Sequence, residues 1–77
     1  MRWQDRISIK PDVCHGKACI NGRRVMVSVI LASLAEADSP ETIMANFHLV
    51  REDIQAAMLF AADMAEDRFL PLEQEVA

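Results

Sequence analysis

The spacing of the apolar residues changes once along this chain, near Ser28, and this change limits what the two parts can form. Residues 6–10 alternate polar and apolar side chains, which is the period of a half-buried strand. From Ser28 onward, the apolar residues recur at the spacing of helices. We therefore expect a mainly α domain with a strand and hairpin over about residues 6–27, a three-helix unit over about 28–69 and a loose tail at 70–77.

The strongest local signal in the N-terminal part is the pair Asn21-Gly22. Short apolar segments flank it, Ala18-Cys19-Ile20 before and Arg23-Arg24-Val25 after. Asn-Gly tolerates the positive φ angles of a type I′ turn, so the pair predicts a tight β hairpin. Pro11 ends the preceding strand, because proline cannot donate to a β ladder.

The first two predicted helices are short. The first, beginning near Ser28 as a candidate N-cap, is apolar on most sides. The second begins at Ser39-Pro40, where serine would cap the helix and proline needs no amide proton. Its predicted inner face consists of Ile43, Met44 and Phe47.

The third helix is predicted from Arg51 to about Arg68, with Glu52 and Asp53 in its first turn, where they complement the helix dipole. Its predicted inner stripe consists of Ile54, Ala57, Met58, Ala61, Met64 and Ala65. Residues 56–62 are apolar all round, which is more than one stripe requires. Leu59 and Phe60 therefore either meet a partner or pack under the hairpin, and the sequence leaves both alternatives open.

The net charge of −4 combines two unlike halves of a 77-residue chain. Residues 1–35 carry six basic and two acidic residues, whereas residues 36–77 carry two basic and ten acidic residues. Such an asymmetry suggests two surfaces with different partners. A single domain of this length encloses only a small core, so we also expect help from a second chain.

The chain begins with charged residues, and its longest nearly apolar run, residues 25–35, is too short to cross a bilayer. We therefore expect a cytoplasmic protein without a membrane segment. In that compartment, Cys14 and Cys19 would be reduced thiols.

The sequence offers little to build a catalytic or metal centre. Four residues have the composition of a zinc site, namely Cys14, His15, Cys19 and His48. However, Cys14 and His15 are adjacent, and no compact Cys-x-x-Cys spacing occurs. No third group is evident that would orient a reactive Cys14–His15 pair. We expect no metal.

Enzymes that use paired carboxylates or phosphate loops are also not indicated. The acidic pairs Glu52/Asp53 and Glu66/Asp67 are adjacent on a helix, where side chains point about 100° apart and do not converge. Gly16 and Gly22 are the only glycines, so no phosphate-binding glycine loop exists. The expectation is a protein that is not an enzyme and needs no cofactor.

The order of these segments is similar to that of domain-of-unknown-function family 433, over about residues 6–66. The segments that carry the resemblance are 14–25, 27–31, 39–43 and 52–57. The resemblance implies a short β element followed by a three-helix, homeodomain-like or winged-helix-like domain of the helix-turn-helix type. It further implies an antitoxin of a type II toxin–antitoxin system, which silences a PIN-like nuclease toxin and represses its own operon.

The chain departs from the family pattern at several turns. Arg23 stands where many members have Thr, and Met26 stands where many have Pro. Ala37 follows the first helix in place of Gly, so we expect the usual left-handed cap to be missing there. The turn at 47–50 lacks the common Pro.

Binding to DNA is the alternative function, as a stand-alone helix-turn-helix transcriptional regulator. The candidate contacts are Arg6, Lys10, Arg23 and Arg24 in the β part, and Arg51 and Gln55 at the start of the third helix. Glu52 and Asp53 oppose such contacts, because carboxylates repel phosphates. We therefore expect the basic N-terminal half to carry any DNA binding.

The acidic half suggests a protein partner. A nuclease that holds RNA needs a basic groove, which carboxylates can block. The candidate partner surface combines the apolar residues Leu59 and Phe60 with Asp63, Glu66 and Asp67. A homodimer is also expected, formed through the open strand edge around Ile7 and Ile9.

Overall fold

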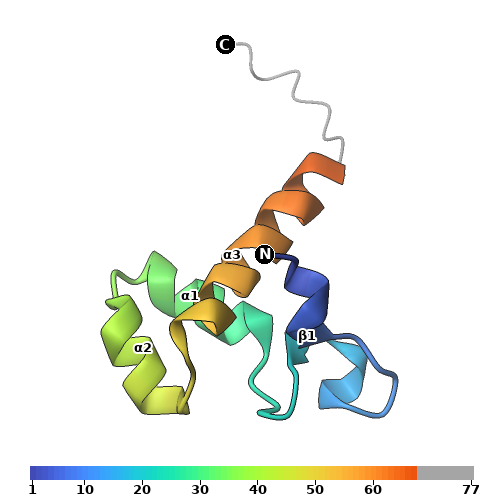
Figure 1. The fold of residues 1–77 in the computed structure, drawn as a ribbon, viewed down its shortest axis with the longest axis horizontal. Helices are drawn as coiled ribbons and strands as arrows, with labels where there is room; N and C mark the ends of the chain where they lie inside the picture. The colour runs from blue at the N-terminus through green and yellow to red at the C-terminus, as the bar shows by residue number, and fades with distance from the viewer. Residues whose placement is uncertain (68–77) are drawn as a thin grey trace.

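The computed structural model describes residues 1–67, which form a three-helix domain preceded by a small β element. In chain order the elements are η1 (Trp3–Asp5), β1 (Ile7–Ser8), η2 (Cys14–Gly16), β2 (Cys19–Ile20), α1 (Val27–Ala35), α2 (Pro40–Phe47) and α3 (Arg51–Asp67) (Figure 1). The predicted mainly α, helix-turn-helix-like fold is confirmed. Arg68, the expected end of the third helix, and the predicted loose tail 70–77 lie outside the described residues.

The β element is a two-stranded antiparallel sheet in which Ile7 pairs with Ile20 and Ser8 pairs with Cys19. The strand predicted over 6–10 is therefore only two residues long, Ile7–Ser8. Ile7 is buried, whereas Ile9 lies beyond the sheet and is 56% exposed.

The chain reverses after β2 as the Asn21-Gly22 pair predicts, but not through a type I′ turn. The Ile20 amide donates to the Val25 carbonyl at 2.9 Å, so four residues form the loop instead of two. Within this loop, positive φ angles occur at Gly22 (77°) and Arg24 (58°). A type I′ turn would need them at two adjacent central residues.

Helix α1 begins two residues earlier than predicted, and Ser28 is not its cap. Met26 is the N-cap, without a side-chain hydrogen bond. The reason lies in the sheet, because the Val27 amide donates to the Ala18 carbonyl at 3.0 Å and thereby starts the helix against β2. Ser28 is exposed within the first turn.

Helix α1 ends in a left-handed cap despite the absence of glycine, so the expectation from the family pattern is wrong. Ala37 has a φ of 70°. The Asp38 amide donates to the Ser33 carbonyl at 3.1 Å and the Ala37 amide donates to the Leu34 carbonyl at 3.0 Å. These two bonds define a Schellman motif, which satisfies carbonyls that the helix leaves open.

Helix α2 begins and packs as predicted. The Ser39 hydroxyl accepts a hydrogen bond from the Thr42 amide at 3.1 Å, and Pro40 occupies the first turn. Ile43 is fully buried, while Met44 and Phe47 pack against the core. The inner face expected from the sequence is confirmed.

The core lies between the three helices and the sheet. Its largest fully buried side chains are Ile20, Val27, Ile30, Ile43 and Ile54. The predicted inner stripe of α3 is partly wrong, because Met58 is 46% and Met64 is 36% exposed. Asp53 and Ala56 are buried instead, which rotates the inner face of α3 away from Met58.

Within the described residues, no helix combines the length and the apolar character needed to cross a membrane.

Candidate binding surfaces

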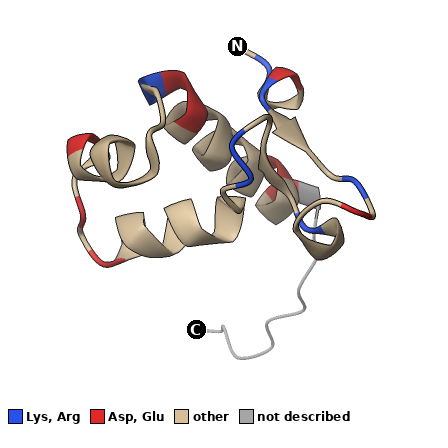
Figure 2. Ribbon diagram, turned by 90° about the horizontal axis from the view of Figure 1, so that it is seen from below, with Lys and Arg blue, Asp and Glu red and all other residues tan. Residues whose placement is uncertain are grey.

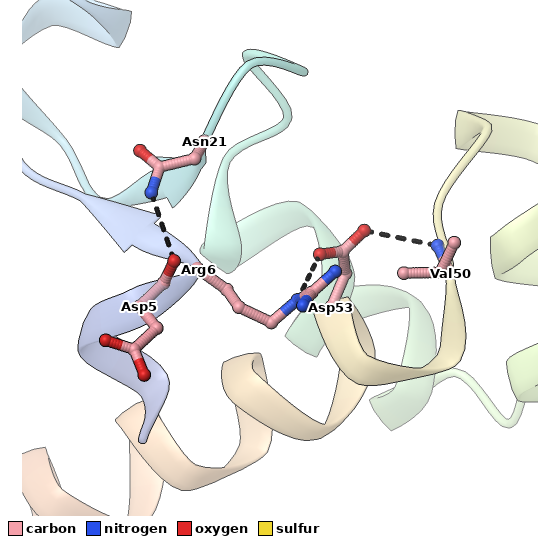
Figure 3. Close-up of polar contacts among 5 residues, drawn as sticks. All are labelled: Asp5, Arg6, Asn21, Val50 and Asp53. Atoms are coloured by element: carbon pink, nitrogen blue, oxygen red, sulfur yellow. Dashed lines mark hydrogen bonds and ion pairs between the residues drawn. The ribbon is translucent and has the colours of Figure 1, made fainter. Parts of the chain in front are cut away.

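Asp53 in the first turn of α3 forms an ion pair with Arg6 of the N-terminal segment, and its side chain is 6% exposed. One carboxylate oxygen accepts a hydrogen bond from the Arg6 Nε at 3.0 Å, and the other accepts from the Val50 amide at 3.1 Å (Figure 3). The second bond caps the helix, since it satisfies an amide that the first turn leaves open. Asp53 thus serves both the cap and the tertiary packing.

The same neighbourhood joins η1 to the hairpin. The Asn21 amide donates to the Arg6 carbonyl at 2.9 Å, and the Asn21 side chain donates to the Asp5 carbonyl at 3.5 Å (Figure 3). The N-terminal segment, the hairpin and α3 are therefore connected through adjacent hydrogen bonds.

These contacts change the expected roles of Arg6 and Asp53 in DNA binding. Arg6, a candidate DNA contact, directs its guanidinium to Asp53, and its side chain is 37% exposed. Asp53, expected to oppose DNA binding, is turned inward and compensated by Arg6. Glu52 is the carboxylate of this turn that remains exposed.

Arg51, the next candidate, pairs with Glu41 of α2 at 3.1 Å, and both side chains are exposed. The pKa of Glu41 lies below its ordinary value. The larger cause is a hydrogen bond from the Glu41 backbone amide, and the second is the Arg51 guanidinium. Gln55 is exposed one turn further along α3.

Arg23 and Arg24, two further candidates for DNA contact, are exposed on the hairpin loop. This loop and the turn before α3 lie at the same lower end of the molecule in Figure 1. Figure 2, seen from below, shows a basic stretch on the hairpin loop facing the viewer. Lys10 is exposed on the separate loop between β1 and η2.

The C-terminal half of α3 extends beyond the rest of the domain (Figure 1). Residues 62–66 are all exposed, including the predicted partner residues Asp63 and Glu66. The side chains of Met58 and Leu59 are 46% and 41% exposed. Asp67 is the last residue of the helix.

The structure separates the two alternatives left open for Leu59 and Phe60. Leu59 faces outward, whereas Phe60 is half-buried and meets Trp3 edge to face, with ring centroids 4.9 Å apart. The Trp3 indole also donates a hydrogen bond to Asp63. The N-terminal segment therefore holds one side of this part of α3.

A shallow groove lies on another side of Phe60. It has a volume of about 350 Å³ and is lined by Lys17, Ala18, Val27, Ser28, Leu31 and Phe60. Met64 follows Phe60 by one helical turn on the same side of α3, so it extends the apolar surface beyond the groove. This groove and Met64 form the groove surface.

A second hollow of about 350 Å³ lies on the outward side of α3, lined by Met1, Gln55, Met58 and Leu59. At the edge of the sheet, the two predicted dimer residues differ in exposure. Ile7 is 4% exposed and belongs to the core, so Ile9 alone of the two predicted dimer residues is accessible.

The residues that could bear chemistry do not converge. Within residues 1–67, no three His, Cys, Asp or Glu side chains are grouped so that they could hold a metal ion. Desolvation, and then the neighbouring Cys19 thiol, raise the pKa of Cys14. A raised pKa keeps this thiol protonated, which opposes nucleophilic reactivity.

Sequence reasoning did not single out Trp3. It placed Leu31 in the first helix and not at a binding surface, and it placed Met58 and Met64 in the core. Trp3 is the only tryptophan, and its position before a β segment in a chain poor in aromatic residues is a signal that could have found it. For the methionines, the misleading signal was the helical spacing, which fits more than one stripe of an apolar helix.

Comparison with known proteins gives one result. The family described as protein of unknown function (DUF433) matches residues 7–61. No curated protein and no solved structure matches the chain. The match includes the sheet, α1, α2 and most of α3, which is more than half of the sequence. The resemblance seen in the order of the segments is thereby confirmed, and the chain belongs to the DUF433 family.

Proposed function

We propose that this chain is an antitoxin-like protein that binds and neutralises a PIN-like nuclease toxin, and that it acts by binding and not by catalysis. The observation that carries the proposal is the groove surface. Its volume of about 350 Å³, with Val27, Leu31 and Phe60 among its walls, can accept an apolar side chain of a partner.

The exposed acidic residues of α3 also favour a nuclease as the partner. Asp63 and Glu66 are exposed on the half of α3 that carries Met64, at the end away from the basic hairpin loop. A nuclease that holds RNA has a basic groove, and complementary charge speeds and selects association. The antitoxin role itself is what resemblance to this family implies.

Co-expression tests the proposal. The chain is produced together with the open reading frame next to its own gene, and growth arrest and co-purification are measured. We expect the neighbour to be toxic alone, and wild-type chain to relieve the arrest and form a complex. A neighbour that is harmless alone would contradict the antitoxin role.

Two matched variants test the surface. Met64→Lys places a positive charge beside the groove, whereas Met58→Lys places the same charge on the outward side of α3. Both methionines are exposed, at 36% and 46%, so neither change disturbs the core. We expect Met64→Lys to abolish co-purification and Met58→Lys to retain it. Equal behaviour of the two variants would contradict the assignment to the groove surface.

DNA binding is a second candidate, favoured by one observation. Arg23 and Arg24 are exposed at the end of the molecule where the helix-turn-helix begins its third helix, and Asp53 there is turned inward. A mobility-shift assay with the DNA upstream of the gene tests this candidate. Arg23→Ala/Arg24→Ala should weaken binding and lower its salt dependence by about two phosphate contacts, while Arg2→Ala at an exposed site elsewhere should not. No shift at low salt would remove the candidate.

A further inference from the structure

A stripe of exposed side chains follows the outward side of α3, away from the core. This outward stripe consists of Arg51, Gln55, Met58, Leu59, Ala62 and Glu66. Spacings of three and four residues place them on one side of the helix. The centre of the stripe is apolar, and its two ends carry opposite charges.

We infer that the outward stripe binds the outward stripe of a second copy of this chain, with the two α3 helices antiparallel. Arg51 stands seven residues before Met58, and Glu66 stands seven residues after Leu59. A two-fold axis between Met58 and Leu59 therefore places each Arg51 beside Glu66 of the other copy. A surface that repeats itself under a two-fold axis is what a symmetric dimer requires.

The charges select this orientation. In a parallel pair, each Arg51 would face Arg51 of the other copy, and Glu66 would likewise face Glu66. In the antiparallel pair, both contacts are attractive. Arg51 already donates to Glu41 through one nitrogen, but a guanidinium has five N–H donors, so it can serve both carboxylates.

The centre of the stripe provides a place for the apolar contact. The hollow of about 350 Å³ lined by Met1, Gln55, Met58 and Leu59 lies where the axis would pass. Leu59 of one copy can enter the hollow of the other, which removes two exposed apolar side chains from water. The groove surface, on another side of α3, remains free, so this inference does not depend on the proposed toxin.

The projection of α3 fits such a pair. Its C-terminal half has little of its own core to contact, and antiparallel pairing would lay it along the N-terminal half of the other α3. The stripe is about 22 Å long. An interface of one helix pair is small, so we expect a dissociation constant on the order of 10 μM. The dimer would also cover Gln55, which leaves DNA contact to Lys10, Arg23 and Arg24.

Sedimentation equilibrium of the full chain from about 1 μM to 1 mM measures the association, with helicity monitored by circular dichroism. We expect Met58→Lys to raise the dissociation constant by at least tenfold. Ile9→Lys, at an exposed apolar position just after β1, should leave it unchanged, and so should Met64→Lys. These controls separate the outward stripe from the strand edge and from the groove surface.

Charge reversal tests the register. Glu66→Arg or Arg51→Glu alone should raise the dissociation constant by about three- to tenfold, because each places two like-charged pairs in the dimer. An equimolar mixture of the two variants should form a heterodimer as tight as wild type, since both pairs are then attractive. The double variant Arg51→Glu/Glu66→Arg should dimerise by itself.

Three outcomes would overturn the inference. The first is a monomer at all concentrations. The second is a dimer that Ile9→Lys disrupts and Met58→Lys does not. The third is a dimer insensitive to Glu66→Arg. If instead the wild type is monomeric and Met58→Lys abolishes co-purification of the neighbouring gene product, the outward stripe binds that partner and the self-association is wrong.

Discussion

The two halves of α3 have the same helical geometry and opposite roles. In the N-terminal half, Ile54, Ala56 and Ala57 are buried, and Asp53 is fastened by Arg6. In the C-terminal half, residues 62–66 are all exposed. Phe60 still packs against the core, and Trp3 contacts both Phe60 and Asp63. One half therefore holds the domain together, while the other leaves most of its side chains exposed.

The difference arises from where the core ends. The side chains of Ala56 and Ala57 are small and fully buried, so this half of α3 lies close against the neighbouring elements. The C-terminal end of α3 projects beyond α1 and α2 (Figure 1). In the described part of the chain, Trp3 of η1 contacts it and donates a hydrogen bond to Asp63. The exposed apolar side chain of Met64 in that part is not buried by the described core.

The largest effect should come from removing a core side chain of the N-terminal half. Ile54 is 1% exposed, so Ile54→Ala leaves a cavity and should lower the free energy of unfolding by roughly 3 kcal/mol. Leu59→Ala, on the same helix but 41% exposed, should cost less than about 1 kcal/mol. Urea unfolding followed by circular dichroism, at a concentration where the chain is monomeric, measures both. Equal losses would break the contrast between the two halves.

The next effect concerns the buried carboxylate. Asp53→Ala removes the acceptor of both Arg6 and the Val50 amide, and should cost about 2 kcal/mol of unfolding free energy. The loss is moderated because Arg6 is partly exposed and can be hydrated. Glu52→Ala, one residue earlier and exposed, should stay within about 0.5 kcal/mol. A loss as large for Glu52→Ala would mean that charge in the first turn, and not the buried contact, stabilises α3.

The sequence predicted those parts of the fold that local rules decide. Ser39 and Pro40 predict the start of α2, and Asn21-Gly22 predicts the chain reversal after β2. Both predictions succeed because capping and turn chemistry act over a few residues. The rotation of α3 was not predictable in this way. The aspartate on the inner face is compensated by the Val50 amide and by Arg6, and Arg6 is far away in sequence.

The candidate surfaces follow the same division. That residues 56–62 carry more apolar surface than one stripe needs was visible in the sequence. Which side chain turns inward was not, because the choice between Leu59 and Phe60 depends on Trp3 at the other end of the chain. The groove likewise combines Leu31 with Phe60, which only the packing of α1 on α3 brings together.

A third prediction concerns the contact that holds the projecting half. Trp3→Ala removes the edge-to-face contact with Phe60 and the hydrogen bond to Asp63, and should cost about 1–2 kcal/mol. Hydrogen exchange should show faster exchange in the last turns of α3 while α1 remains protected. Gln4→Ala, exposed in the same short helix, is the control. Uniform loss of protection would instead make Trp3 part of the global core.

A smaller effect should come from the turn between α1 and α2, which contains Ala37. Ala37 has a φ of 70°, a conformation that costs an alanine more than a glycine. Ala37→Gly should therefore raise the free energy of unfolding by about 0.5–1 kcal/mol. Ala35→Gly, two residues earlier inside α1, should lower it by a similar amount. Thermal unfolding of both variants checks the opposite signs.

The smallest effect tests the exposed pair at the start of α3. Arg51→Gln should raise the pKa of Glu41 toward its ordinary value without reaching it, because the hydrogen bond from the Glu41 amide remains the larger cause of the lowering. Titration of the Glu41 carboxyl by NMR measures this change, in a Met58→Lys background in which self-association is weakened. A pKa that does not move would mean that the pair makes no contribution in solution.

The sign of the pH dependence follows from the same shift. Since the folded pKa of Glu41 lies below the unfolded one, its contribution to stability is complete above the unfolded pKa and is lost as the pH falls through the folded pKa. Wild type and Arg51→Gln should therefore differ in stability at neutral pH and converge in acid. If they differ equally at both, Arg51 stabilises the first turn of α3 through packing of its stem and not through Glu41.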